Sequence, residues 1–175
     1  MAWVKSNPNE ILKDFPNMQD YLPYLEELGK ESPRGKVLIS TGFMEQVLKE
    51  ILCAFLVEGK VAEELFEGGN APLGTFSARA KLAFTLGLVS EKEFQDLELI
   101  RKIRNEFAHN VKASFDDPAI VARRRSLQHK VPDHPDRPMR PEEQFTTAST
   151  GLLLNIINRP AHVSKKRRSY GNWNR

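Results

Sequence analysis

A chain of 175 residues, 40% of them apolar, is long enough for one compact domain with polar segments beside its core. The single cysteine, Cys53, excludes an internal disulfide framework, and its apolar neighbours in ILCAFLV predict a buried, unreactive thiol. No stretch approaches the roughly 18 apolar residues of a membrane span, and residues 1–10 lack a signal-peptide core, so we expect a cytoplasmic protein.

The net charge of +3 is distributed unevenly along the chain. Residues 1–116 carry 14 Lys and Arg residues against 18 Asp and Glu residues. Residues 117–141 carry six basic and three acidic residues, whereas residues 159–175 carry six basic residues and no acidic residue. An acidic body argues against a broad nucleic-acid-binding surface on the core, so any such contact is expected in the two basic segments.

Two helices are predicted in the first third of the chain. The segment NMQDYLPYLEELGKESP predicts a short helix that is interrupted by Pro23 and ends near Gly29. A longer helix is expected from Pro33, and Gly42 inside it suggests the close approach of another helix. Its apolar stripe at helical spacing comprises Met44, Val47, Leu48, Ile51, Leu52 and Phe55.

Three more helices are predicted before residue 111. GKVAEELFEGGN predicts a short helix that two glycines end, and a second helix follows the Pro-Leu-Gly turn and ends at Gly87. Ser90 and Glu93 form an S-x-x-E capping box, which marks the start of a third helix. The apolar residues expected on the last two helices are Phe76, Ala80, Ala83 and Phe84, then Phe94, Leu97, Ile100, Ile103 and Phe107.

The helical pattern weakens after residue 116. Asp117 and Pro118 could cap a short helix, but residues 117–141 as a whole read as a basic, proline-rich loop. EEQFTTASTGLLLNIINR predicts a last helix, and residues 159–175 predict a basic flexible tail. Without strand alternation or repeats, residues 1–158 predict an all-α fold, a compact bundle of about five or six helices. The apolar face of the last helix comprises Phe145, Ala148, Leu152 and Ile156.

The block APLGTFSARAKLAFTLGLVSEKEFQDLELIRKIRNEFAHN, residues 71–110, resembles the bacterial mannitol operon repressor family. The shared features are the Pro-Leu-Gly turn, an S-x-R-x-K-L helix, an LG stop and an acidic helix with the pattern E-F-x-D. The preceding helix matches loosely, and the sequence after Pro118 does not match. The resemblance implies an all-helical, cytoplasmic, oligomeric regulator that represses a sugar operon without a recognisable helix-turn-helix.

The end of this block, RNEFAH, resembles the HEPN domains. Their mark is Arg followed after four to six residues by His, often with Asn directly after the Arg; here these residues are Arg104, Asn105 and His109. Many HEPN proteins are dimeric, metal-independent ribonucleases, and others are inactive binding modules. The resemblance therefore implies a HEPN-like bundle and makes Arg104, Asn105 and His109 candidate catalytic residues.

A helical wheel at about 100° per residue separates these three residues. With Phe94 at zero, the apolar residues from Leu97 to Phe107 occupy an arc from about 180° to 300°, and Arg104 lies inside it at about 280°. Asn105 and His109 share another face. The three side chains could converge only if the helix frays at its end or if two copies meet across a two-fold axis.

In such a dimeric site, His109 could accept the proton of an RNA 2′-hydroxyl, because histidine is the side chain most often used as a general base near neutral pH. Arg104 would hold the phosphate, and Asn105 would orient the histidine or a phosphate oxygen. No metal is expected, because the four histidines have no ligand spacing, and no cofactor is expected either. They are His109, His129, His134 and His162.

A structural interpretation of the same residues is also open. A histidine near a helix C-terminus interacts favourably with the helix dipole, and Asn110 is a common type of C-cap. Arg104 could pair with a glutamate of a neighbouring helix. The candidate glutamates are Glu45, Glu63 and Glu64.

The basic segments are candidate nucleic-acid contacts, for RNA or DNA, in which aromatic residues could stack on bases. The alternative is a solvated loop and a solubilising tail. The residues concerned are Arg123, Arg124, Arg125, Lys165, Lys166, Arg167 and Arg168, with Tyr170 and Trp173 as the aromatic residues.

Taken together, these features favour a bacterial regulatory protein, a homodimer that controls transcription through a protein partner. One alternative is a metal-independent HEPN-type endoribonuclease acting as a toxin or defence effector. Another is a non-catalytic protein-binding or immunity module.

Overall fold

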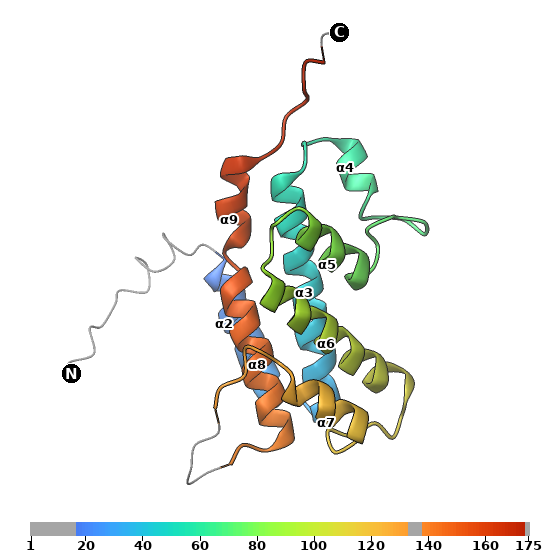
Figure 1. The fold of residues 1–175 in the computed structure, drawn as a ribbon, viewed down its shortest axis with the longest axis vertical. Coiled ribbons are helices and arrows are strands. Elements are labelled where there is room, and N and C mark those ends of the chain that lie inside the picture. The colour runs from blue at the N-terminus through green and yellow to red at the C-terminus, as the bar shows by residue number, and fades with distance from the viewer. Residues whose placement is uncertain (1–16, 133–137, 174–175) are drawn as a thin grey trace, which may run out of the picture.

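The computed structural model describes residues 17–132 and 138–173, and within them the chain is helical with no strand (Figure 1). This confirms the predicted all-α bundle. None of the described helices is long and apolar enough to cross a membrane. In chain order the helices are α2 (Met18–Lys30), α3 (Pro33–Phe55), α4 (Lys60–Glu64), α5 (Phe76–Thr85), α6 (Glu91–His109), α7 (Pro118–Arg125), α8 (Pro141–Ile156), α9 (Arg159–Val163) and the 3-10 helix η1 (Ser164–Lys166).

Helix α3 is the central element of the bundle. It starts where the Ser32 side chain accepts a hydrogen bond from the Gly35 N–H, with Pro33 at the first helical position. It then packs against α2, α5, α6, α8 and α9, which surround it in Figure 1. The predicted stripe from Met44 to Leu52 is fully buried, which makes this helix the spine of the core.

Two details of α3 differ from expectation. Gly42 is exposed, and a Cβ added there would meet nothing within 4 Å, so the prediction of a close helix approach at this position is wrong. Cys53 is only half-buried, although burial raises the pKa of its thiol above the usual value, as expected for an unreactive cysteine.

Helices α5 and α6 form a pair whose ends follow the sequence signals. Gly87 has a φ of 69°. The N–H groups of Gly87 and Leu88 donate to carbonyls of the last turn of α5, which gives a Schellman ending. The capping box is present at the start of α6, with Ser90 N donating to Glu93 Oε2 at 2.7 Å. These local signals orient α6 across α3 and α5.

Helix α7 occupies the first third of residues 117–141, for which the sequence predicted either a short helix or a basic loop. Pro118 stands at its first position, and Ile120 is buried against the core. The helix packs against α6 and α8. Residues 133–137, within the proline-rich part of the predicted loop, lie outside the described residues, as does His134.

The C-terminal segment begins inside the helical body. Helix α9 starts at Arg159, where a flexible tail was expected to begin, and it packs against α3. Val163 is buried, and the N–H of Arg168 donates to the carbonyl of Phe55 at 2.7 Å. Short-range sequence signals did not reveal these contacts, because each joins residues far apart in the chain. In Figure 1 the chain leaves the bundle only beyond η1.

Candidate functional site

Arg104 and Asn105 line a pocket of about 280 Å³ between α3, α5 and α6, which we call the Arg104 pocket. Helix α6 carries both residues because its apolar face is turned towards α3. As the helical wheel predicts, Leu97 and Ile103 on this face are fully buried, and Arg104 lies at its margin. The polar side chains of the wall are Thr41 and Glu45 from α3, Thr75 and Ser77 from the start of α5, and Arg101, Arg104 and Asn105 from α6.

Arg104 is half-buried, and its guanidinium makes one hydrogen bond within the described residues, from Nη1 to Asn105 Oδ1 at 3.2 Å. The two nearby acids have other partners. Glu45 lies 3.7 Å from Arg79, and Glu98 accepts two hydrogen bonds from Arg101 at 3.1 and 2.8 Å. No carboxylate of the described residues therefore forms an ion pair with Arg104.

The bonds from Arg101 have a further electrostatic effect. They hold the pKa of Glu98 below its ordinary value, against the opposing effect of burial. Glu98 thus remains ionised and bound to Arg101 over the physiological range. Arg101 is neutralised by this neighbour, although it lies on the wall of the same pocket as Arg104.

His109 does not line the Arg104 pocket. It is the last residue of α6, and its side chain is exposed. The structure thus brings together two of the three residues of the predicted catalytic group, Arg104 and Asn105, and separates the third. A catalytic role for Arg104, Asn105 and His109 stays a prediction.

The C-terminal end of α6 is held by Arg34, which the sequence did not single out. Its guanidinium donates hydrogen bonds to the carbonyls of Phe107, Asn110 and Val111, the last two at 2.9 and 2.8 Å. It also lies 5.8 Å from the centre of the Phe107 ring. A cation from the first turn of α3 therefore satisfies the carbonyls that a helix end leaves without partners.

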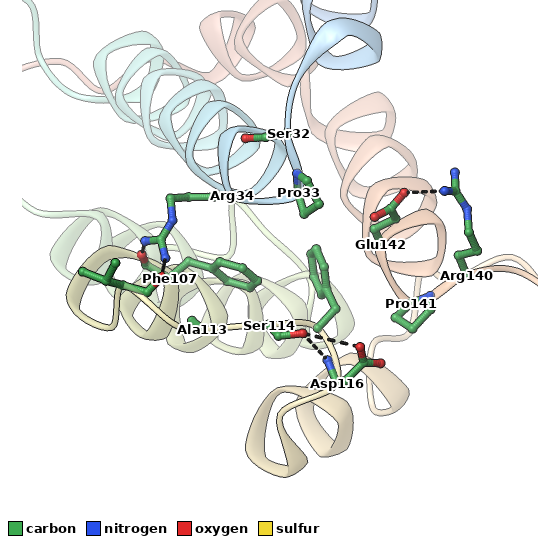
Figure 2. A pocket seen from close by; sticks show the side chains of 12 residues that line it. Ser32, Pro33, Arg34, Phe107, Ala113, Ser114, Asp116, Arg140, Pro141 and Glu142 are labelled. Atoms are coloured by element: carbon green, nitrogen blue, oxygen red, sulfur yellow. Dashed lines mark hydrogen bonds and ion pairs between the residues drawn. The ribbon is translucent and has the colours of Figure 1, made fainter.

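A second pocket of about 420 Å³, the Arg34 pocket, lies beside this helix end (Figure 2). Its two arginines already have partners: Arg34 is bound to the carbonyls of α6, and Arg140 pairs with Glu142 and Glu143, both at 3.1 Å. In Figure 2 Phe107 and Pro33 form part of its apolar wall. This pocket carries no cation comparable with Arg104.

Glu93 is a buried carboxylate at the other end of α6. It accepts hydrogen bonds from Arg159 Nη1 and Nη2 at 2.6 and 2.8 Å, besides the capping bond from Ser90. Burial by itself would raise the pKa of Glu93, but the hydrogen bonds and charge of Arg159, with those from Ser90, bring it below its ordinary value. This ion pair connects α6 to α9.

Asp96, one turn further on, is completely buried. Its carboxylate accepts hydrogen bonds from the backbone N–H groups of Gln128 and His129 at 2.8 to 3.0 Å, and its Oδ2 lies 2.7 Å from His129 Nδ1. Asp96 therefore fixes the chain that follows α7 onto α6. Helical periodicity could have predicted the burial of both acids. Glu93 and Asp96 fall at about 260° and 200° on the helical wheel, inside the same apolar arc as Arg104.

The predicted nucleic-acid contacts of α7 differ in their surroundings. Arg124 is buried and donates a hydrogen bond to Gln144, while Arg123 pairs with Glu106 at 2.8 Å. Arg125 is exposed. Of the three arginines, only Arg125 projects fully from the surface, because α7 presents its other side to α6 and α8.

The predicted contacts of the C-terminal segment are exposed. Lys165 and Lys166 line a groove of about 710 Å³ together with Phe55 and Arg159. Arg167 pairs with the exposed Glu58 at 3.3 Å. The remaining predicted residues, Arg168, Tyr170 and Trp173, are also exposed.

No group of three or more His, Cys, Asp or Glu side chains within the described residues is arranged to hold a metal ion.

Comparison with known proteins adds both sequence and structural relatives. The chain is 34% identical over 101 residues to the mannitol operon repressors of Escherichia coli K12 and of E. coli O6:H1 strain CFT073. This match covers 57% of the chain and 49% of each relative, so the chain spans about half the length of the curated relatives it matches.

The fold is similar to a chain in the X-ray structure of the MtlR–HPr complex from Escherichia coli, with a TM-score of 0.58 and 19% sequence identity. The similarity covers 81% of this chain and 96% of the solved one. The sequence profile of the mannitol repressor family matches residues 31–161, from the start of α3 to α9. The chain therefore belongs to the mannitol repressor family.

Proposed function

We propose that this protein is a cytoplasmic, homodimeric regulator of the mannitol repressor kind that acts through a protein partner of the HPr type. The match of the family profile to residues 31–161 carries the proposal, because it includes nearly the whole helical body. The similarity to a chain solved in complex with HPr supports a protein as the partner.

The charges of the described residues also support partner binding over broad contact with DNA. The body up to residue 116 is acidic, and two arginines of the basic α7 are occupied, Arg123 by Glu106 and Arg124 by Gln144. A surface of this kind does not offer the row of phosphate-binding cations that DNA-binding faces use.

Calorimetric titration of the full chain with HPr from the same organism tests the partner. We expect saturable binding, and deletion of the gene should raise expression of a mannitol-operon reporter. Sedimentation analysis of the chain alone tests the homodimer. Absence of HPr binding together with an unchanged reporter would overturn the proposed function.

A second candidate function is a metal-independent endoribonuclease. The observation that favours it is the exposure of His109 at the end of α6, while Arg104 and Asn105 lie together in a pocket. In one chain these groups do not form one site, but a second copy could bring its His109 to the pocket.

Cleavage of a single-stranded RNA in EDTA tests this candidate. Wild type should cleave the RNA and His109→Ala should not, whereas His162→Ala, an exposed histidine on α9, should keep full activity. Equal activity in wild type and His109→Ala, or none in wild type, would exclude the endoribonuclease. The remaining alternative would then be a non-catalytic protein-binding module.

Contact of the basic segments with RNA or DNA is a further part of the proposal. A truncation after Arg159 would remove the buried Val163 and weaken the fold, so substitutions are the sharper test. Lys165→Gln together with Lys166→Gln should weaken binding of a short duplex at low salt. Unchanged affinity would exclude this contact.

A further inference from the structure

We propose that the Arg104 pocket binds a small phosphoryl-type oxyanion, held by Arg104 with donors from Asn105 and the first turn of α5. The endoribonuclease candidate would use the same Arg104 and Asn105, but binding of a small phosphoryl compound requires neither RNA cleavage nor a protein partner. The pocket's volume of about 280 Å³ is just below the roughly 300–1,000 Å³ of drug-sized ligand pockets, which suits a small anion.

The first observation is that Arg104 has no carboxylate partner among the described residues. A half-buried guanidinium loses part of its hydration and needs an anion or several acceptors in return. Arg104 has only the amide oxygen of Asn105 among the described residues, at 3.2 Å. Most of its five N–H donors therefore remain for a ligand.

The second observation is that the hydrogen-bonding groups around Arg104 are mainly donors. Because the Asn105 oxygen accepts from Arg104, its NH₂ group is left to donate. The Thr75 oxygen accepts from the Ala78 N–H at 3.2 Å, so its hydroxyl hydrogen is also left to donate. Ser77 adds a further hydroxyl on the same wall.

The negative charge on the pocket wall already has a cationic partner. Glu45 is the one carboxylate on the described wall, and Arg79 lies 3.7 Å from it. Thr41 adds no donor to the pocket, because its hydroxyl hydrogen is bound to the Val37 carbonyl at 2.6 Å. The pairs Arg79–Glu45 and Arg101–Glu98 each cancel, so the charge of Arg104 leaves the group with a net charge of +1.

The positions of the donors select the shape of the anion. Arg104 and Asn105 come from α6, whereas Thr75 and Ser77 come from the start of α5 on another wall of the pocket. Donors from different walls suit the several oxygens of a tetrahedral phosphoryl group, whereas a flat carboxylate presents two. The N-terminal end of α5 favours negative charge, and Arg104 supplies the specific contact.

Titration of the full chain with inorganic phosphate and with glycerol 3-phosphate, followed by calorimetry, tests the proposal. Wild type should bind both saturably, and Arg104→Ala should weaken binding at least about 10-fold, which is the effect of one charge-assisted hydrogen bond. Lys102→Ala is the matched control, because it removes an exposed cation from the same helix. It should bind phosphate as wild type does.

Two further variants separate lost binding from lost folding. Arg104→Lys keeps the charge but not the planar fork and should bind with intermediate affinity, while Ser77→Ala should weaken binding with an unchanged circular dichroism spectrum. Equal phosphate affinity in wild type and Arg104→Ala, or no saturable binding in wild type, overturns the proposal. Tighter binding of acetate than of phosphate overturns the choice of a phosphoryl group.

Discussion

The two halves of α6 carry buried or half-buried charges that differ in whether other parts of the chain bind them. In the N-terminal half, both oxygens of Glu93 and of Asp96 accept hydrogen bonds from other parts of the chain. In the C-terminal half, Arg104 lies on the same side of the helix and bonds only to its neighbour Asn105 among the described residues. The first two charges fasten α9 and the chain after α7, and the third faces a pocket.

This difference distinguishes structural from functional charges within one helix. A buried charge with a complete set of partners stabilises the fold only in its ionised, bonded form, so its removal should be costly. A half-buried charge without a counter-ion adds little stability, so its removal should cost little. The stability of variants in both halves, each with a control, can test whether the two halves differ in this way.

The largest effect is expected at Asp96. Asp96→Ala should lower the free energy of unfolding by about 3 kcal/mol, because the N–H groups of Gln128 and His129 lose their acceptor and a cavity remains at a fully buried position. Urea denaturation measures the loss. Asp96→Asn keeps the volume and one acceptor oxygen and should lose less. A loss below about 1 kcal/mol in the alanine variant would contradict a structural role.

The ion pair between α6 and α9 should come next. Arg159→Met should lower the free energy of unfolding by about 2 kcal/mol at pH 7, because Glu93 stays buried without its partner. Arg167→Met is the control: it breaks the exposed pair with Glu58 and should cost less than about 0.5 kcal/mol. Similar losses in the two variants would show that burial of the pair does not matter.

The same pair predicts a dependence of stability on pH. Because the folded-state pKa of Glu93 lies below its ordinary value of 4.5, its stabilisation is complete above that pH and is lost as the pH falls through the folded value. Denaturation of wild type and Glu93→Gln down to about pH 3 should show their difference shrinking on acidification. The stability of Glu93→Gln should still fall slightly on acidification, because the pKa of Glu98 is also lowered in the folded protein. A constant difference over the whole range would contradict the assignment.

The smallest effect is expected at Arg104. Arg104→Met in buffer without phosphate or sulfate should be neutral or stabilise the protein by up to about 1 kcal/mol, because a half-buried charge without a counter-ion is replaced by an apolar side chain. Thermal unfolding measures the change. Arg101→Met, which breaks the pair with Glu98, should instead be slightly destabilising. A clear loss of stability in Arg104→Met would show that Arg104, like Glu93 and Asp96, has a structural role.

Much of the fold could be predicted from the sequence because its signals are local. The capping box of Ser90 and Glu93, the stop at Gly87 and the apolar stripe of α3 each depend on residues within a few helical turns. The start of α9 could not be predicted in this way. Its helix is short, and its position depends on a buried Val163 and on a partner for Arg159 in another helix.

The sequence by itself determined that α6 is an amphipathic helix with Arg104 inside its apolar arc. Only the tertiary structure decided which of its charges are neutralised, because the partners come from distant positions: Glu93 and Arg159 are 66 residues apart, and Asp96 and His129 are 33 apart. Arg34, which holds the end of α6, is 73 residues from Phe107. Helical periodicity fixes the direction in which a side chain points, but the partners that it meets depend on how the whole chain packs.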